Sequence, residues 1–315
     1  MKISVIIPCH NGEKTITSSL LSVAGQEYKA HEIIVVDDHS EDRSVDLIRA
    51  SGVDVKLVSA GATGASNARN EGIAIATGDW LAFLDADDLW YPNHLSRAEQ
   101  FISTHKVVGY LNHYDWVSQT DTIFTKKKSP VDAEITDQGI DTYLNLYLKY
   151  KHFVGMSACI VERKRAKLIG GFDPELVRRH DIDFWLRIID NQGWFFDPQA
   201  TSAYRKNTQN SLSSNLPSAA LYRYLAFKKN RHLTNSLIYD LLLKQFAMTA
   251  LLKGALSEKE QDHKLASELV YNDFCLLEKA LSKVLTQFPE LLKYYKKALK
   301  VRFRCLSQFK KQKIW

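Results

Sequence analysis

Three carboxylates lie within four residues, in Asp85-Ala86-Asp87-Asp88. They follow the apolar run Trp80-Leu81-Ala82-Phe83-Leu84, which predicts a buried strand that ends at this acidic cluster. Open α/β sheets bind their ligands at the edge where parallel strands end. Carboxylates this close raise one another's pKa, and a divalent cation with oxygen ligands keeps all of them ionised. The cluster therefore predicts a hard metal between protein carboxylates and a substrate phosphate. A turn that merely favours Asp is the alternative.

The residues around this cluster alternate between strand and helix patterns. Strands are expected at residues 3–7, 32–36, 53–58 and 80–84, and helices at about 14–24, 43–50 and 66–76. This alternation predicts a mainly parallel, doubly wound sheet, in which right-handed crossovers bring the carboxyl ends of the strands to one edge. We expect three loops to meet there, at residues 8–12, 37–40 and 85–88.

The pattern changes after the first hundred residues. Residues 107–125 favour an irregular, antiparallel pair of strands, followed by an exposed turn at 126–130. From about residue 218 the chain has few Gly or Pro residues and long runs of helix formers, which predicts three or four appended helices. We therefore expect an α/β domain over residues 1–214 and a helical region over residues 215–315.

Composition narrows the class of protein. Of the 315 residues, 45% are hydrophobic, which is ordinary for a chain with a sizeable core. The four cysteines form no Cys-x-x-Cys pair, which argues against a zinc knuckle and a compact disulfide framework. The first residues lead into a strand pattern and lack signal-peptide features, and Asp240, Lys244 and Lys253 interrupt the most apolar later segment. These features favour a cytoplasmic protein.

The basic charge is concentrated at the C-terminus. Residues 291–315 hold nine Lys or Arg and no Asp or Glu, whereas the whole chain has a net charge of +6. On a helix, Leu292, Tyr295 and Leu299 would share an apolar side, with Lys293 and Lys297 opposite. Such a helix either docks peripherally on an anionic membrane surface, at the inner face of the plasma membrane, or packs on the protein. Nucleic acid is not an expected partner, because no recognition motif accompanies the charge.

Four motifs occur in order along the α/β region. They are SVIIPCHNG at 4–12, IIVVDDHS at 33–40, ASNARNEG at 65–72 and FLDADD at 83–88. Together they resemble family 2 glycosyltransferases, and the later segments GGFD at 170–173 and DIDFWLR at 181–187 extend the resemblance over about residues 2–214. The resemblance implies a GT-A fold, a Rossmann-like, mainly parallel twisted sheet with helices on both faces, here with a C-terminal helical extension. It also implies inverting sugar transfer from a nucleotide-sugar donor, most often UDP-linked.

The resemblance also assigns roles to individual residues. Asp87 is the implied principal ligand of Mg²⁺ or Mn²⁺, Asp85 contacts ribose or a metal-bound water, and Asp88 shares the metal. Donor contacts are implied for Pro8, Asn11, Asp38, Arg69, Asp85, Ala86, Asp87 and Arg205. Among these, Asp38 would read the nucleoside and Arg69 would grip the diphosphate. The alternatives are that Asp38 caps the helix near Arg43 and that Arg69 is a solvated helical residue.

The segment at 181–187 supplies the implied general base, Asp181. A carboxylate there would take the proton of an acceptor hydroxyl as the new bond forms. An N-cap of the helix that follows is the alternative role, and Asp183 is the fallback base. Many family members have Glu before the base, whereas this chain has His180. Residues 204–213 resemble a segment that folds over bound donor, with Arg205 or Lys206 meeting the diphosphate.

These observations predict a metal-dependent glycosyltransferase acting on a carbohydrate or lipid-linked glycan acceptor in envelope polysaccharide assembly. One alternative is a nucleotidyltransferase that makes the sugar nucleotide. That class needs a Gly-rich, Arg-containing loop after the first strand, which residues 8–12 do not provide. The other alternative is a non-catalytic glycan or membrane adaptor that retains the fold. The intact acidic cluster and Asp181 argue against it.

Overall fold

The computed structural model describes residues 1–118, 121, 124–125, 129, 133–150, 155–205 and 216–255. By its internal contacts the chain divides into two compact units, Met1–Ser211 and Leu212–Trp315. The functional division expected from the sequence, at residues 1–214 and 215–315, remains a proposal.

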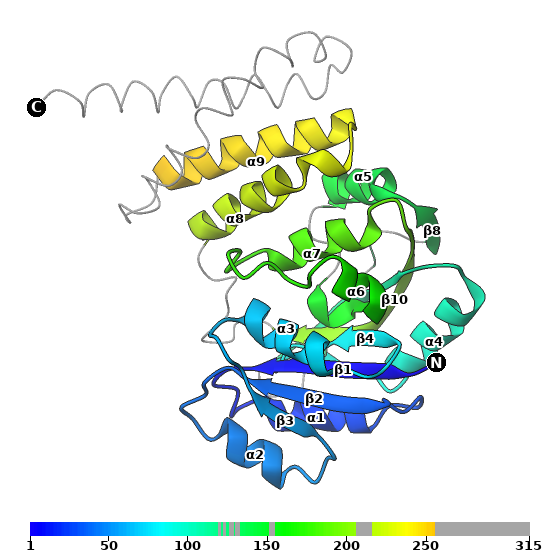
Figure 1. The fold of residues 1–315 in the computed structure, drawn as a ribbon, viewed down its shortest axis with the longest axis vertical. Coiled ribbons are helices and arrows are strands. Elements are labelled where there is room, and N and C mark those ends of the chain that lie inside the picture. The colour runs from blue at the N-terminus through cyan, green and yellow to red at the C-terminus, as the bar shows by residue number, and fades with distance from the viewer. Residues whose placement is uncertain are drawn as a thin grey trace, which may run out of the picture. The chain divides into compact units, whose positions relative to one another are not determined.

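The first unit is built on one ten-stranded sheet (Figure 1). The strands are β1 (Ile3–Cys9), β2 (Glu32–Asp37), β3 (Lys56–Ser59), β4 (Trp80–Phe83), β5 (Leu89–Trp90), β6 (Gly109–Val117), β7 (Phe124–Thr125), β8 (Ile135–Gln138), β9 (Cys159–Glu162) and β10 (Gly193–Arg205). Their order is β3-β2-β1-β4-β9-β6-β10-β5, with β7 beside β6 and β8 beside β10. The first four are parallel neighbours, as the sequence predicts, and β9 is antiparallel to both β4 and β6.

Helices connect these strands and cover both faces of the sheet (Figure 1). They are α1 (Ile16–Ala24), α2 (Ser44–Ala50), α3 (Ala65–Ile75), α4 (His94–Thr104), α5 (Ile140–Tyr150), α6 (Arg163–Leu168), α7 (His180–Ile189) and the short 3₁₀ helix η1 (Met156–Ala158). The arrangement confirms the predicted α/β class.

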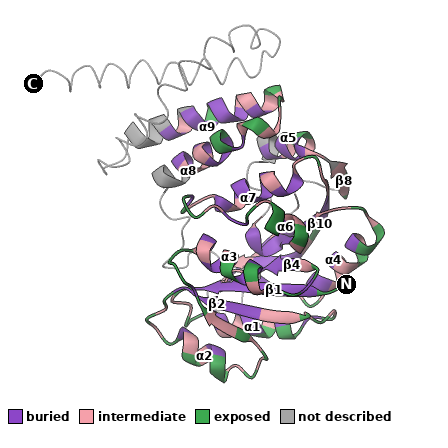
Figure 2. Cartoon of the chain, in the orientation of Figure 1, coloured by how far each residue is buried: buried purple, intermediate pink, exposed green. Residues whose placement is uncertain are grey.

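Side-chain alternation along β1 divides the core into two layers. Val5 and Ile7 belong to a buried cluster completed by apolar side chains of α1, α2 and α4. Ile6 points to the other face, where Gly72 of α3 lies against it. Figure 2 shows the resulting band of buried residues along β1 and β4.

An aromatic cluster fixes α7 to the end of β4. Phe184 of α7 stacks on Phe172 with ring centroids 3.9 Å apart, and Phe83 meets the two rings edge-on at 5.8 and 5.4 Å. Trp185, the next residue of α7, is 3% exposed and lies against Gly109 of β6. The first turn of α7 is thereby held near the carboxyl end of β4.

The third strand differs from expectation. A strand was predicted at 53–58, whereas β3 spans Lys56–Ser59. Val53, Val55 and Leu57 alternate as in a strand, but the first two lie in the α2–β3 connection after Gly52, whose φ is 72°. They still pack against the core, which explains why their apolar pattern misleads. The predicted antiparallel pair at 107–125 is confirmed by β6 and β7. The turn predicted at 126–130 lies outside the described residues, except for Ser129.

In the second unit, the described residues form α8 (Leu216–Lys229), the 3₁₀ helix η3 (Arg231–Leu233) and α9 (Leu237–Ala255). Phe227 of α8 contacts Tyr239 and Phe246 of α9, with ring centroids 5.3 and 4.8 Å apart. Within the part of the chain that the structure describes, no helix has the length and apolar content needed to cross a membrane. The basic segment at 291–315 lies outside the described residues.

The contact between α3 and β1 predicts a stability effect. A Cβ added to Gly72 would lie 2.4 Å from Ile6 Cγ2, between α3 and β1, so Gly72→Ala should lower the free energy of unfolding by about 1–3 kcal/mol. Gly155→Ala is the control, because its φ of −107° suits alanine and its added Cβ meets no described atom within 4 Å. Urea denaturation measures both variants. Equal stability of the two variants would contradict the packing described.

Candidate active site

The first two of the three predicted loops meet at the carboxyl edge of the parallel strands. The Cys9 carbonyl at the end of β1 accepts from the Asp38 N–H at 2.7 Å. Asn11, with a φ of 50°, donates its N–H to Ser40 Oγ at 3.0 Å, and its Oδ1 accepts from the Glu41 N–H at 2.9 Å. Asn11 therefore holds the loop after β1 to the loop after β2.

The third loop, at residues 85–88, lies beside the first. A Cβ built on Gly12 would be 3.6 Å from the Cβ of Ala86. The buried hydroxyl of Ser19 in α1 donates to the carbonyls of Ala86 or Asp88, which are 2.9 and 2.8 Å away. Pro8 is buried within β1, directly before this junction. The convergence of loops expected from the alternation of strands and helices is confirmed.

Asp38 joins the end of β2 to the loop before α3. Its side chain is 11% exposed, and its two carboxylate oxygens accept from the Gly64 N–H at 3.0 and 2.9 Å. Gly64 has a φ of 109°, which residues with a side chain rarely adopt. Arg43 occupies the N-cap position of α2, so the alternative role of Asp38 as an N-cap is wrong.

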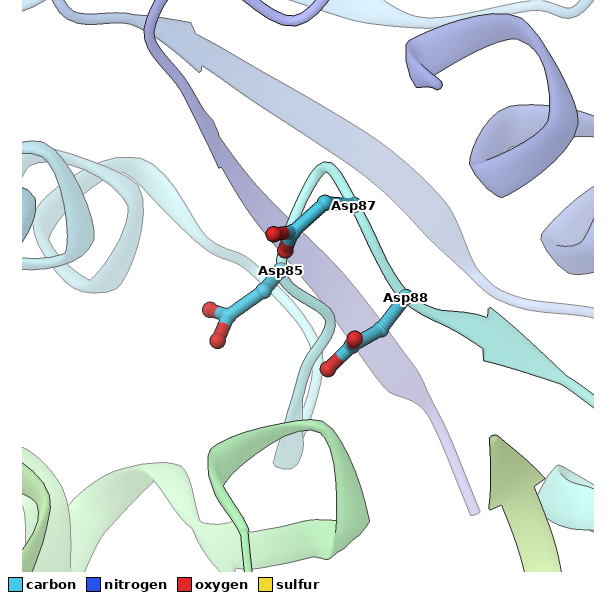
Figure 3. Close-up of side chains that lie close together, drawn as sticks. All are labelled: Asp85, Asp87 and Asp88. Carbon is cyan, nitrogen blue, oxygen red and sulfur yellow. The ribbon is translucent and has the colours of Figure 1, made fainter. Parts of the chain in front are cut away.

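The acidic residues form a closed turn, which we call the acidic turn (Asp85–Asp88; Figure 3). The Asp88 N–H donates to the Asp85 carbonyl at 3.0 Å. Each of the three carboxylates offers an oxygen, and these atoms all lie within 4.8 Å of one another. Opposite ligands of Mg²⁺ are about 4.2 Å apart when each lies about 2.1 Å from the ion. Small side-chain rotations would therefore suffice for an all-oxygen divalent site.

The three carboxylates differ in their surroundings. Asp85 and Asp87 are half-buried, whereas Asp88 is 2% exposed. Burial raises the pKa of Asp88 well above its usual range, the charges of Asp87 and Asp85 raise it further, and hydrogen bonds from Ser157 and Arg205 oppose the rise. Both oxygens of Asp88 accept from the protein, because Ser157 Oγ donates at 2.6 Å and the Arg205 N–H at 3.0 Å. Asp85 and Asp87 are therefore better placed to meet a ligand.

Arg69 of α3 connects the acidic turn to α7. It is 4% exposed, so the alternative of a solvated helical Arg is wrong. Its Nη2 lies 2.5 Å from Asp85 Oδ1, and its Nη1 lies 2.8 Å from His180 Nε2. Both terminal nitrogens thus contact the protein, while Nε has no hydrogen-bond partner among the described residues. With both terminal nitrogens engaged, Arg69 is suited to position Asp85. A bidentate contact of Arg69 with the diphosphate stays a prediction.

His180, the residue that departs from the family pattern, is the other partner of Arg69. Burial, and next to it the adjacent charge of Arg69, lower its pKa from the ordinary value of 6.5 to about 4, although the charges of Asp181 and Asp85 oppose the fall. The imidazole is therefore neutral at neutral pH, so that Nε2 can accept the proton of Arg69 Nη1.

Asp181 follows in the first turn of α7 and is half-buried. The cap residue of α7 is Arg179, so the alternative role of Asp181 as an N-cap is wrong. Burial raises the pKa of the Cys159 thiol, and the charges of Asp181 and Asp85 raise it further, which indicates that both carboxylates lie near this thiol. Asp183, the fallback base, is fully buried and lies 2.5 Å from Arg187, which makes it unsuited to meet an acceptor.

Arg205, expected to meet the diphosphate, is 1% exposed at the end of β10. Its Nε donates to the Asp87 carbonyl at 2.7 Å, and its Nη1 donates to the Ser118 carbonyl at 3.0 Å and pairs with Asp121. Its guanidinium therefore braces the acidic turn, and its contact with the diphosphate stays a prediction. The rest of the segment predicted to fold over the donor, from Lys206 on, lies outside the described residues.

Sequence reasoning missed two side chains that hydrogen-bond to the acidic turn. Ser157 and Ser19 bond to it, yet both are isolated serines without a motif. These serines are separated from their partners by 72 and 67 residues of sequence, so only the folded structure reveals the contacts. Trp194 is fully buried and its indole N–H donates to the Gly139 carbonyl, so this side chain belongs to the core.

The neutral state of His180 predicts how stability depends on pH. Its pKa is about 4 in the folded chain and 6.5 when unperturbed, so its contribution to stability is fully present above pH 6.5 and is lost as the pH falls toward 4. Between pH 6 and pH 5, the free energy of unfolding of the wild type should fall by about 1 kcal/mol more than that of His180→Gln. Urea denaturation followed by tryptophan fluorescence measures this difference. An equal decrease in the free energy of unfolding for the wild type and His180→Gln would contradict the lowered pKa of His180.

Comparisons with known proteins identify the family of the chain. Residues 4–167 match the family model described as Glycosyl transferase family 2. WfgD of Escherichia coli, named UDP-Glc:alpha-D-GlcNAc-diphosphoundecaprenol beta-1,3-glucosyltransferase, is 30% identical over 216 residues, which cover 68% of this chain and 80% of WfgD. AmsB of Erwinia amylovora, an amylovoran biosynthesis glycosyltransferase, is 31% identical over 201 residues, which cover 61% of this chain and 65% of AmsB.

A solved structure shares the fold. TarS residues 1–349 of S. aureus, crystallised with UDP-GlcNAc, superimposes with a TM-score of 0.70 at 19% identity, over 94% of this chain and 92% of that one. This likeness supports the GT-A fold that the motifs imply. With a family match over more than half of its length and a sheet edge that gathers the motifs of that family, the chain belongs to glycosyltransferase family 2.

Proposed function

We propose that this protein transfers a sugar from a UDP-linked donor to a hydroxyl of a carbohydrate or lipid-linked glycan, with inversion and with the help of a divalent metal. The observation that carries the proposal is the chain of contacts from Asp85 through Arg69 to His180. It ties the carboxylates suited to a metal to the helix turn that bears Asp181.

The acidic turn supplies the proposed metal ligands. Asp87 and Asp85 would hold Mg²⁺ or Mn²⁺, with Asp88 sharing the ion if its carboxylate is released from its protein partners. The all-oxygen set suits a hard cation. When bound, such an ion neutralises negative charge that develops on the departing nucleotide. Arg205 and Arg69 keep the turn and Asp85 in place for that task.

The loops after β1 and β2 supply the proposed donor site. Asp38 would accept from the uracil N3–H or a ribose hydroxyl, while Pro8, Asn11 and Ala86 shape the adjoining loops. Two comparisons favour a uridine nucleotide, since the name of WfgD specifies UDP-Glc and TarS was crystallised with UDP-GlcNAc.

Asp181 is the proposed general base. It would remove the acceptor hydroxyl proton as oxygen attacks the anomeric carbon, and this single displacement inverts that carbon. The β linkage in the name of WfgD is what inversion of an α-linked donor produces. The name of WfgD favours a lipid-linked glycan acceptor, and the names of WfgD and AmsB together favour envelope polysaccharide assembly. Attachment to an anionic membrane through residues 291–315 is part of the proposal and rests on their sequence alone.

The metal role predicts a donor-binding defect. Wild-type protein should bind UDP more tightly with Mn²⁺ than with EDTA, and Asp87→Ala should lose this increment, because the main bridge between metal and turn is gone. Isothermal titration calorimetry measures both conditions. Asp46→Ala on the exposed side of α2 is the control. An Mn²⁺-dependent increment that survives in Asp87→Ala would reject this residue as principal ligand.

The base role predicts a separate defect. Asp181→Asn should bind UDP as the wild type does and lose about 10²–10⁴-fold in kcat, because the amide takes no proton from the acceptor. Release of UDP from a panel of UDP-sugars, with lipid-linked glycans as acceptors, measures the rate. Asp190→Asn, just beyond the other end of α7, should transfer normally. Unchanged transfer by Asp181→Asn would exclude Asp181 as the base.

A further inference from the structure

The hydroxyl of Ser157 links the two ends of the acidic turn. It lies in η1, just before β9, and is 5% exposed. Its hydroxyl accepts from the Asp85 N–H at 3.0 Å and donates to Asp88 Oδ2 at 2.6 Å. One hydroxyl thus binds the first and the last residue of the turn, in parallel with the backbone hydrogen bond from Asp88 to Asp85.

The backbone of Ser157 is itself fixed. The indole Nε1 of Trp90 donates to the Ser157 carbonyl at 2.7 Å, and Trp90 is 4% exposed and stacks on His94 with ring centroids 4.2 Å apart. The hydroxyl therefore acts from a rigid support and not from a mobile loop. A serine hydroxyl has one proton to donate and can accept as well, so it satisfies both ends of the turn at once.

The position of Asp87 depends on this closure. Asp87 is the third residue of the turn, so the direction of its carboxylate relative to Asp85 follows from the turn geometry. Ser157 contacts neither of these carboxylates and sets their spacing through the backbone of Asp85 and the side chain of Asp88. Groups that orient ligands in this way affect metal affinity without touching the metal.

From this geometry we propose that Ser157 is a positioning residue that holds the Asp85 and Asp87 carboxylates at the spacing needed to bind a divalent cation with the donor diphosphate. The inference rests on the proposed metal-assisted function. It predicts that loss of the hydroxyl weakens binding of the cation beyond what the accompanying loss of stability explains.

The chain contains a matched control for that distinction. Ser4 in β1 is fully buried, and its hydroxyl donates to Glu32 Oε1 at 2.6 Å and accepts from the Gly78 N–H at 2.9 Å. Ser4 therefore makes the same pair of bonds as Ser157, to a carboxylate and a backbone N–H. It lies near the amino end of β1, away from the acidic turn.

The test compares Ser157→Ala with Ser4→Ala in the full chain. Electron paramagnetic resonance of free Mn²⁺, at saturating UDP, gives the Kd for Mn²⁺, and thermal unfolding gives Tm. Both variants should lose a similar amount of Tm. Ser157→Ala should raise the Kd for Mn²⁺ by about 10-fold or more, whereas Ser4→Ala should leave it within about twofold of the wild type. If Ser157→Ala does not fold, Ser157→Cys, with a weaker donor of similar size, gives the same comparison.

The other outcomes distinguish a failure of the positioning role from a failure of the metal-assisted function. Equal Kd values for Mn²⁺ in wild type and Ser157→Ala would overturn the positioning role, as would equal losses of affinity in the two alanine variants. Failure of the wild type to bind Mn²⁺ with UDP would instead contradict the metal-assisted function, and this inference would fall with it.

Discussion

The pairing of buried Arg69 with Asp85 is the interaction on which the arrangement of this site depends. A buried guanidinium needs partners, and Arg69 finds them on two elements that are distant in sequence, Asp85 in the acidic turn and His180 in α7. The neutral His180 completes the set, since a charged imidazole would repel Arg69. One side chain thereby sets the relation between the proposed metal ligands and the first turn of α7.

Packing from several directions surrounds that contact. The stack of Phe172 and Phe184 against Phe83 fixes α7 to β4, while Ser19, Ser157 and Arg205 hold the acidic turn from α1, η1 and β10. Buried hydrogen bonds of this kind are costly to break, because each leaves an unpaired polar group. The turn can therefore keep carboxylates close together despite their mutual repulsion.

Much of this was accessible from the sequence. Periodicity gave the parallel strands up to β4, and the rule that such strands end at one edge gave the meeting of the three loops. Periodicity failed at Val53 and Val55, whose alternation serves a loop that packs on the core. Motifs singled out Arg69 and Arg205, but their contacts with His180, Asp85 and the acidic turn could not be predicted, because burial is decided by long-range packing. The bonds of Ser157 had no local signal at all.

A crystal structure of the protein with UDP and Mn²⁺ tests the central claim most directly. The account predicts an anomalous Mn²⁺ peak about 2.1–2.3 Å from a carboxylate oxygen of Asp87, the uracil beside Asp38, and Asp181 facing the same pocket. Mn²⁺ and UDP bound away from the acidic turn, or Asp181 facing a separate surface, would contradict it.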